Sequence, residues 1–197
     1  MKRKVSALLS AIILLSVVFV SCSCGKTPSH TTDGLKILKI NNGVLLECAG
    51  QADENGVYRI PDNVFEIGEG AFSNDTTVKK IIVGANVKKI SAAAFYANSS
   101  LNEIVFEGNG LESIGGGAFI GCTSLKSVIL PDGLKELGPY AFFSCSSLQS
   151  VVIPDGIKEI YSYTFARCSS LTSVTLPDSV EKIGTAAFNF CSALSDI

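Results

Sequence analysis

The sequence predicts a repeat solenoid, mainly β, with short helical or irregular corners. Two observations carry this prediction. A phenylalanine recurs every 23 or 24 residues over the second part of the chain, and aliphatic residues keep the same period at fixed offsets from it. A unit this short cannot bury enough apolar surface to fold alone, so successive units must stack on one another.

Six phenylalanines, each preceded by Ala or Thr, mark the period: Phe72, Phe95, Phe119, Phe142, Phe165 and Phe188. A Pro or Gly stands eleven residues before each one, and an aliphatic residue follows six and nine residues after it. The single step of 24 residues falls near the sequence FEGNG, where a surface turn can absorb an extra residue. These columns predict six successive coils of the same shape.

Each element of a coil follows from its residue pattern. Alternation in LKSVILP predicts a short strand, which Pro131 ends because proline cannot donate to a strand ladder. The segment DGLKELG predicts a turn and a second extended run past Leu134 and Leu137. The segment PYAFFSCSS predicts a compact or single-turn helical corner that places Phe142 inside. One coil is therefore expected to contain two extended segments and one corner.

The pattern C-x-x-L-x-x-V-x-L-P-D-x-L-x-x-[IL]-G-x-x-A-F resembles the BspA-like class of leucine-rich repeats, over about Tyr58 to Ile197. The resemblance implies a curved solenoid with a parallel β-sheet on one face. It also implies that residues 35–57 form an N-terminal β cap on the solenoid of residues 58–197. The sequence stops in CSALSDI, before the expected proline, so we expect the repeat region to be truncated at its C-terminus.

The N-terminus is an export signal. Three basic residues precede an uncharged apolar run, Val5 to Val20, which is short for a membrane span. Residues 1–21 are therefore predicted to be a signal peptide. The small residue before Cys22 resembles a bacterial lipoprotein lipobox, which implies that Cys22 is lipidated; Cys24 and an uncleaved anchor remain alternatives. A flexible tether, 22–34, follows, and the rest of the chain is expected outside the cytoplasm, at the envelope or cell surface.

The composition argues against nucleic-acid binding and against catalysis. The chain has 16 basic and 18 acidic residues, so no charge excess favours nucleic acid. The only histidine, His30, lies in the polar tether, where a solvated residue is expected rather than a general base. Mixed charges in one column, such as Lys135-Glu136 and Lys158-Glu159, predict a solvated face of ion pairs rather than an acid–base site.

Four cysteines keep the repeat period, Cys122, Cys145, Cys168 and Cys191, and Asn98 fills the same position in an earlier coil. Thiols strung along a stack at about 4.8 Å per coil cannot converge on one metal ion. Parallel side-chain vectors also make a disulfide dihedral hard to reach. We therefore expect buried free thiols, no metal and no cofactor; Cys48 has no partner that the sequence identifies.

Two sets of residues are candidates for contact with a ligand. Strand alternation points Ile82, Val105, Ile129, Val152 and Thr175 outward, where they would form a ribbon of β-branched side chains. Strand propensity alone is the alternative explanation. The second set surrounds the irregular fifth coil and comprises Tyr140, Phe143, Tyr161, Tyr163 and Arg167. Tyr and Arg are favoured in interfaces, although repair of packing around that coil is the alternative.

The sequence thus predicts a lipid-anchored binding protein of the cell envelope rather than an enzyme. The BspA-like resemblance implies adhesion to a protein or glycan of a host or neighbouring cell. A structural scaffold or spacer without an external ligand is the second hypothesis. An enzyme is the weakest, because the repeats contain no metal motif, phosphate loop or nucleophile elbow.

Overall fold

A computed structural model describes residues 37–49 and 52–195 as a hairpin followed by a β-solenoid of six coils. We number the coils one to six by the phenylalanines Phe72 to Phe188. The predicted signal peptide, Cys22 and the tether lie outside the described residues. Among the described residues, the chain forms no helix long and apolar enough to cross a membrane.

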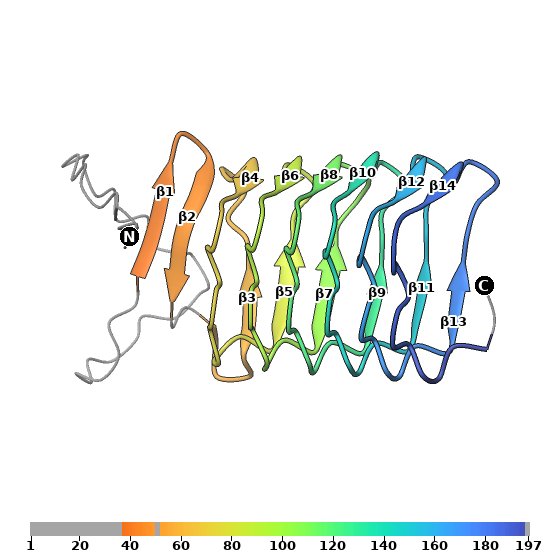
Figure 1. Ribbon diagram of the computed structural model, residues 1–197. Coiled ribbons are helices and arrows are strands. Elements are labelled where there is room, and N and C mark those ends of the chain that lie inside the picture. The colour runs from red at the N-terminus through yellow and green to blue at the C-terminus, as the bar shows by residue number, and fades with distance from the viewer. Residues whose placement is uncertain (1–36, 50–51, 196–197) are drawn as a thin grey trace, which may run out of the picture.

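The segment for which the sequence predicts a cap contains an antiparallel hairpin, β1 (Ile37–Asn41) and β2 (Val44–Ala49). Its turn contains Asn42 and Gly43, both with left-handed backbone. Strand β2 then pairs in parallel with the first short strand of the solenoid. The hairpin therefore lies against the first coil and extends its sheet by two strands (Figure 1).

One face of the solenoid is a six-stranded parallel sheet that takes one strand from each coil. Its strands are β3 (Val57–Arg59), β5 (Lys80–Val83), β7 (Glu103–Phe106), β9 (Ser127–Ile129), β11 (Ser150–Val152) and β13 (Ser173–Thr175). Equivalent residues are partners in this ladder, as in the pairing of Val151 with Val174. The repeat period thus sets the register directly.

A second row of short parallel strands lies along another face, so strands occupy two faces where the resemblance implied one. They are β4 (Glu66–Ile67), β6 (Lys89–Ile90), β8 (Ser113–Ile114), β10 (Glu136–Leu137), β12 (Glu159–Ile160) and β14 (Lys182–Ile183). This row is interrupted between β10 and β12. The interruption adjoins Tyr161, which occupies the position that Gly138 and Gly184 hold in the neighbouring coils. At either glycine, an added Cβ would lie 2.6 Å from the backbone of the preceding coil, so a bulky residue fits this position poorly. The smaller Ser91 occupies the position without breaking the row.

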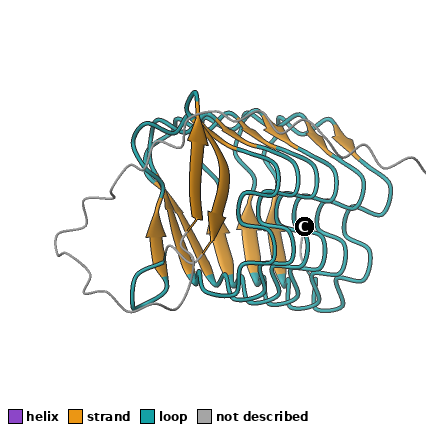
Figure 2. Cartoon of the chain, turned by 90° about the vertical axis from the view of Figure 1, so that its left-hand side faces the viewer, coloured by secondary structure: helices purple, strands orange, loops and turns teal. Residues whose placement is uncertain are grey.

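The third face is a stack of turns, and the described residues contain no helix there. The corner of coil two closes through a hydrogen bond of ordinary length, 3.0 Å, from the Tyr96 amide to the Ala93 carbonyl. Coils are also joined here, since the Phe95 amide donates to the Ala118 carbonyl at 2.8 Å. Figure 2 shows these turns superimposed along the axis, with the strands on the other sides. The sequence predicts either a compact corner or a single helical turn, and the structure shows a compact corner of hydrogen-bonded turns.

The core is a column of stacked phenylalanine rings. The rings of coils one to five are fully buried, and neighbouring centroids lie 4.9 to 5.6 Å apart from Phe72 to Phe188. The aliphatic columns surround them, and Ile67, Ile90 and Ile114 are completely buried. In coil six the equivalent Ile183 is 50 % exposed, since among the described residues a coil packs against it on one side only.

Candidate functional site

The five residues of the predicted ribbon lie on neighbouring strands of the longer sheet, β5 to β13. Ile82 is the register partner of Val105, and Val152 is the partner of both Ile129 and Thr175. Exposure differs along the row: Ile129 is 84 % and Val152 59 % exposed, whereas Ile82 and Val105 are half-buried. The open apolar surface is therefore centred on β9 and β11.

An ion pair crosses the N-terminal part of the ribbon. Arg59 on β3 donates from both terminal nitrogens to the two carboxylate oxygens of Glu107, at 2.7 and 2.6 Å. Glu107 follows β7, so the Arg59 side chain must pass over β5 to reach it. The hydrogen bonds from Arg59 hold the pKa of Glu107 below its ordinary value. This bidentate bridge lies at the end of the ribbon where Ile82 and Val105 are half-buried.

The extra residue of the third coil opens a cleft beside the ribbon. Strands β7 and β9 pair only at Glu103–Ser127 and Ile104–Val128, and the backbones separate beyond that point. The resulting hollow has a volume of about 320 Å³, and its walls include Val105 and Ile129. The ribbon, Ile82, Val105, Ile129, Val152 and Thr175, is thus a narrow apolar strip with a cleft at its middle.

The second predicted set is only partly brought together. The rings of Tyr140 and Tyr163 stack with centroids 4.9 Å apart, and Phe143 tilts against Tyr140 at 5.8 Å. The Arg167 guanidinium carbon lies 5.7 Å from the ring centroids of Phe143 and of a residue that sequence analysis missed, Phe190. We call these five residues the aromatic ridge: Tyr140, Phe143, Tyr163, Arg167 and Phe190.

Tyr161 does not join the aromatic ridge. Among the described residues its ring contacts none of the other aromatic rings. It lies instead near Lys182, whose pKa is raised mainly by its hydrogen bond to Glu159 and slightly by Tyr161. The reason is geometric, because the intervening backbone turns at the corner and sends Tyr161 and Tyr163 to different sides.

Four of the five ridge residues occupy backbone positions that favour glycine. In every coil the residues two before and two after the phenylalanine have positive φ, and coil three fills both positions with glycine, Gly117 and Gly121. In coils four to six, Tyr140, Tyr163, Arg167 and Phe190 adopt φ of 59° to 62°. A side chain in this region costs on the order of 1–2 kcal/mol per residue. Non-glycine residues occupy these positions in other coils too, as at Asn74, Ala93 and Ala97, so the left-handed backbone belongs to the corner itself.

Cross-coil hydrogen bonds hold the strained residues in place. The amide of Tyr163 donates to the Thr185 carbonyl at 3.1 Å, and that of Arg167 to the Asn189 carbonyl at 2.7 Å. The left-handed backbone is therefore fixed by neighbouring coils rather than by the ridge side chains themselves. Replacing a ridge residue should leave its backbone where it is.

The cysteines within the described residues are free thiols, as the spacing predicts for the four of the repeat column. The Cys122 thiol donates to the Phe95 carbonyl of the previous coil at 3.2 Å, and Cys145, Cys168 and Cys191 make the same contact. Asn98 reaches the Phe72 carbonyl at 3.5 Å from the same column. Burial raises the pKa of Cys122 to about 12. These thiols join coils, and within residues 37–49 and 52–195 no group of side chains has the arrangement of a metal site.

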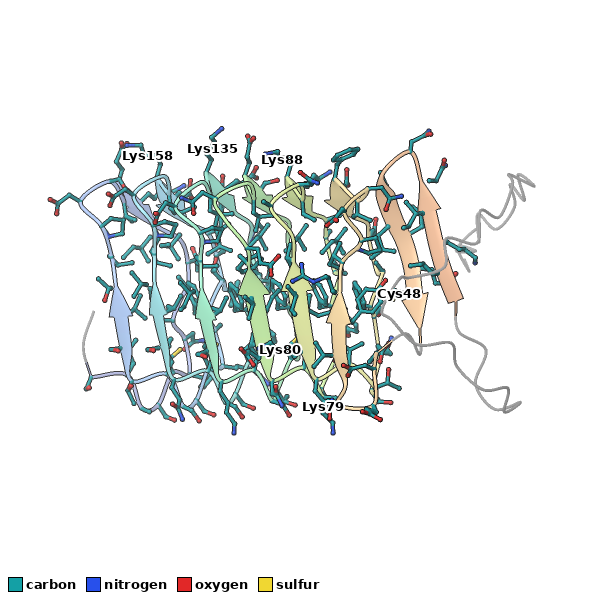
Figure 3. The ribbon with its side chains drawn as sticks, turned by 180° about the vertical axis from the view of Figure 1, so that it is seen from behind. Cys48, Lys79, Lys80, Lys88, Lys135 and Lys158 are labelled. Carbon is teal, nitrogen blue, oxygen red and sulfur yellow. The ribbon has the colours of Figure 1, made fainter. Side chains whose placement is uncertain are left out.

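The fifth cysteine of the described residues, Cys48, lies where the hairpin meets the first coil (Figure 3). It is buried, and burial raises the pKa of its thiol to about 12, partly offset by a hydrogen bond with Tyr58. The sequence identifies no partner for it, because Tyr58 is brought beside it only by the stacking of the hairpin on the coil. A thiol in this state is a poor nucleophile.

The charged column forms ion pairs between neighbouring coils. Lys89 pairs with Glu66 at 3.0 Å, and Lys135 with Glu112 at 2.9 Å. Figure 3 shows Lys88, Lys135 and Lys158 along one edge and Lys79 at the opposite edge. The hydrogen bond from Lys135 holds the pKa of Glu112 below its ordinary value. The predicted face of solvated ion pairs is confirmed, and exposed pairs of this kind add little stability.

Comparison with known proteins identifies the repeat. The pattern described as BspA type leucine rich repeat region matches residues 57–115 and 96–197, with six copies. The chain belongs to this family. No curated protein matches the chain.

Solved structures show the same fold. A leucine rich cell surface protein from Faecalibacterium prausnitzii A2-165 is 28% identical with a TM-score of 0.69, over 86% of this chain and 54% of the other. A leucine-rich repeat protein from Bacteroides ovatus ATCC 8483 is 25% identical with a TM-score of 0.60, covering 85% and 52%. The T. pallidum leucine rich repeat protein is 24% identical with a TM-score of 0.61, covering 85% and 91%. The BspA-type chain thus spans about half the length of the first of these proteins.

Proposed function

We propose that this BspA-type protein is a bacterial surface lipoprotein, anchored through Cys22, that binds a protein of a host or neighbouring cell. The observation that carries the proposal is the exposed part of the ribbon, where Ile129 and Val152 present β-branched side chains from a rigid sheet. Neither side chain is needed by the core, and contiguous exposed apolar surface is typical of interaction sites. The cell-surface description of the F. prausnitzii relative supports the location.

The chemistry of the ribbon favours a protein ligand. Its exposed centre is apolar and narrow, and the adjoining cleft between β7 and β9 can receive one anchoring side chain. The rim is polar, with Glu103 and Asp132 among the residues of the cleft. An apolar centre with a polar rim is the usual arrangement of a protein interface.

The experiment compares adhesion of intact cells that display the protein or its Ile129→Lys/Val152→Lys variant to immobilised extracellular-matrix proteins. We expect the variant to lose at least about tenfold in adhesion, since two exposed contact residues become charged. Phe65→Lys is the matched control, because Phe65 is a comparably exposed apolar residue outside the ribbon. Equal adhesion by all three proteins contradicts the binding role, and failure of an impermeant label to reach the protein on intact cells contradicts surface display.

A further inference from the structure

The aromatic ridge is not required by the fold. In earlier coils the same two left-handed positions hold Gly117, Gly121, Ala93 and Ala97, and these coils have the same geometry. In coils four to six, four of the six positions carry large side chains and the other two hold Ser144 and Ala186. Among the large side chains, Phe190 is 67 % and Tyr140 40 % exposed. Packing of the core therefore does not account for the exposed rings.

The ridge has an open aromatic face. One face of the Tyr163 ring is covered by Tyr140. On its other side, coil six places only the methyl group of Ala186 in the same column. Phe190 extends the ridge in the next coil, beyond Arg167. Flat, rigid rings with a free face suit the flat apolar face of a pyranose, whose C–H groups carry positive charge toward the negative ring face.

The ridge is also positively charged and has no acidic residues around it. Within the described part of the chain, the ion pairs join carboxylates to other cations, and Arg167 pairs with rings instead of with a carboxylate. The corner segments 139–147, 162–170 and 185–193 contain no Asp or Glu. A guanidinium held between two rings keeps its N–H donors for a carboxylate. The complementary ligand is therefore an anion.

The hollow beside Arg167 has the size of a small-molecule site. Arg167, Ser169 and Phe190 line an open hollow of about 340 Å³, at the small end of the range for small-molecule sites. The Ser169 hydroxyl and the two tyrosine hydroxyls supply the polar groups that sugar hydroxyls require.

We propose that the aromatic ridge binds an acidic glycan, with a carboxylate-bearing sugar ring stacked on the aromatic side chains and its carboxylate held by Arg167. This site is separate from the ribbon and goes beyond the proposed protein-binding function, since binding by the purified protein depends on neither the ribbon nor the lipid anchor. The ligand class follows from three features together: open ring faces, an Arg without a carboxylate partner, and acid-free surroundings.

The test measures binding of the purified protein to acidic oligosaccharides and their neutral counterparts. The probes are 3′-sialyllactose against lactose, hyaluronan oligosaccharides against chitin oligosaccharides, and oligogalacturonate against its methyl ester. We expect at least one acidic probe to bind and its neutral partner to bind about tenfold or more weakly. Arg167→Gln should bring the acidic probe down to the affinity of the neutral one, the change expected on losing a charged hydrogen-bonded contact.

Glycine variants separate contact from folding. Phe190→Gly and Tyr163→Gly remove the rings at positions whose backbone favours glycine, so binding should fall about tenfold or more while the protein stays folded by circular dichroism. Tyr96→Ala removes an exposed ring on another coil and should leave glycan binding unchanged. Ile129→Lys, which tests the ribbon, should also leave it unchanged, so the two proposals can fail separately.

Three results overturn the proposal. One is that none of the acidic probes binds the protein. Another is that an acidic probe binds Arg167→Gln as tightly as it binds the original protein. The third is that polyglutamate competes fully with the acidic oligosaccharide, or binds while the oligosaccharides do not, which would identify the ridge as a site for acidic protein segments.

Discussion

The phenylalanine column offers a direct measurement of how coils stabilise one another. Phe119 lies in the third coil and Phe188 in the sixth, at the same position of the repeat. The Phe119 ring is fully buried between Phe95 and Phe142, with centroids 4.9 and 5.0 Å away. The Phe188 ring is partly buried and, among the described residues, stacks only on Phe165, at 5.6 Å. Substitution by alanine therefore removes two ring contacts in one case and one in the other.

The two costs follow from burial and from the number of neighbours. Truncating a fully buried Phe to Ala costs about 3–5 kcal/mol. Phe119 should fall at the upper end, since its neighbours are fixed by cross-coil hydrogen bonds, as from the Phe119 amide to the Ala141 carbonyl at 2.8 Å, and cannot close the cavity. Phe188→Ala removes one ring contact and a side chain that is only partly buried. The expected loss of unfolding free energy is therefore about half that of Phe119→Ala, roughly 2 kcal/mol. The expected difference is at least about 2 kcal/mol.

The measurement is equilibrium urea unfolding followed by far-UV circular dichroism in the presence of a reductant. Phe119→Leu is the control, because it keeps most of the volume and should cost less than about 1.5 kcal/mol. If Phe119→Ala and Phe188→Ala lower the free energy of unfolding equally, stability does not pass between neighbouring coils in the way that a stacked repeat requires. A Phe119→Leu cost equal to that of Phe119→Ala would show that ring stacking, not volume, dominates.

Three further predictions concern the thiols, the glycine corner and the lipid anchor. Burial raises the pKa of Cys122 from 9.0 to about 12, so the unfolded chain loses the thiol proton first as the pH rises. The free energy of unfolding should therefore fall by about 1.4 kcal/mol per pH unit above pH 9. Cys122→Asn introduces the residue that Asn98 supplies in the same column and should reduce that slope in urea titrations at about pH 8 to 11. Gly115→Ala should lower the unfolding free energy more than Gly116→Ala, since an added Cβ would meet backbone at 2.7 Å rather than 3.4 Å, and equal costs contradict this. Cys22→Ser should move the protein out of the membrane fraction on immunoblots; retention there contradicts lipidation at this residue.

The regular columns could be predicted from the sequence because one geometry repeats six times. Phe142 and Leu137, for example, are completely buried, as their spacing implies. A position that is apolar in every coil can be assigned to the core, because six copies of the same position agree even where one coil has an unusual residue. The second row of short strands is harder to predict, since strands of two residues such as β10 are too short to show an alternation of apolar and polar side chains.

The candidate surfaces depended on contacts that the columns do not encode. Arg59 pairs with Glu107 at the end of the ribbon, although the two are 48 residues apart and meet only after three coils have stacked. Phe190 joined the ridge for a similar reason, because its contact with Arg167 crosses from one coil to the next. An interaction that occurs between only one pair of coils leaves no recurring pattern in the sequence, so it cannot be predicted from the other coils.

The left-handed positions explain why the corner of coil three is misleading in the sequence alone. In SIGGGAFIGC, Gly115 lies close to the backbone of the previous coil, Gly116 would bring a Cβ only to ordinary contact distance from Pro139, and Gly117 and Gly121 lie at positive φ. Four glycines that resemble a phosphate loop thus have three separate structural reasons, none of which involves a ligand. The residues of the proposed glycan site stand at the equivalent positions of coils four to six, where Tyr140, Tyr163, Arg167 and Phe190 adopt the backbone geometry that glycine fills without strain. Non-glycine residues also occupy the left-handed positions of coils one and two, so it is the size and exposure of the ridge side chains, rather than the backbone conformation alone, that single out the proposed site.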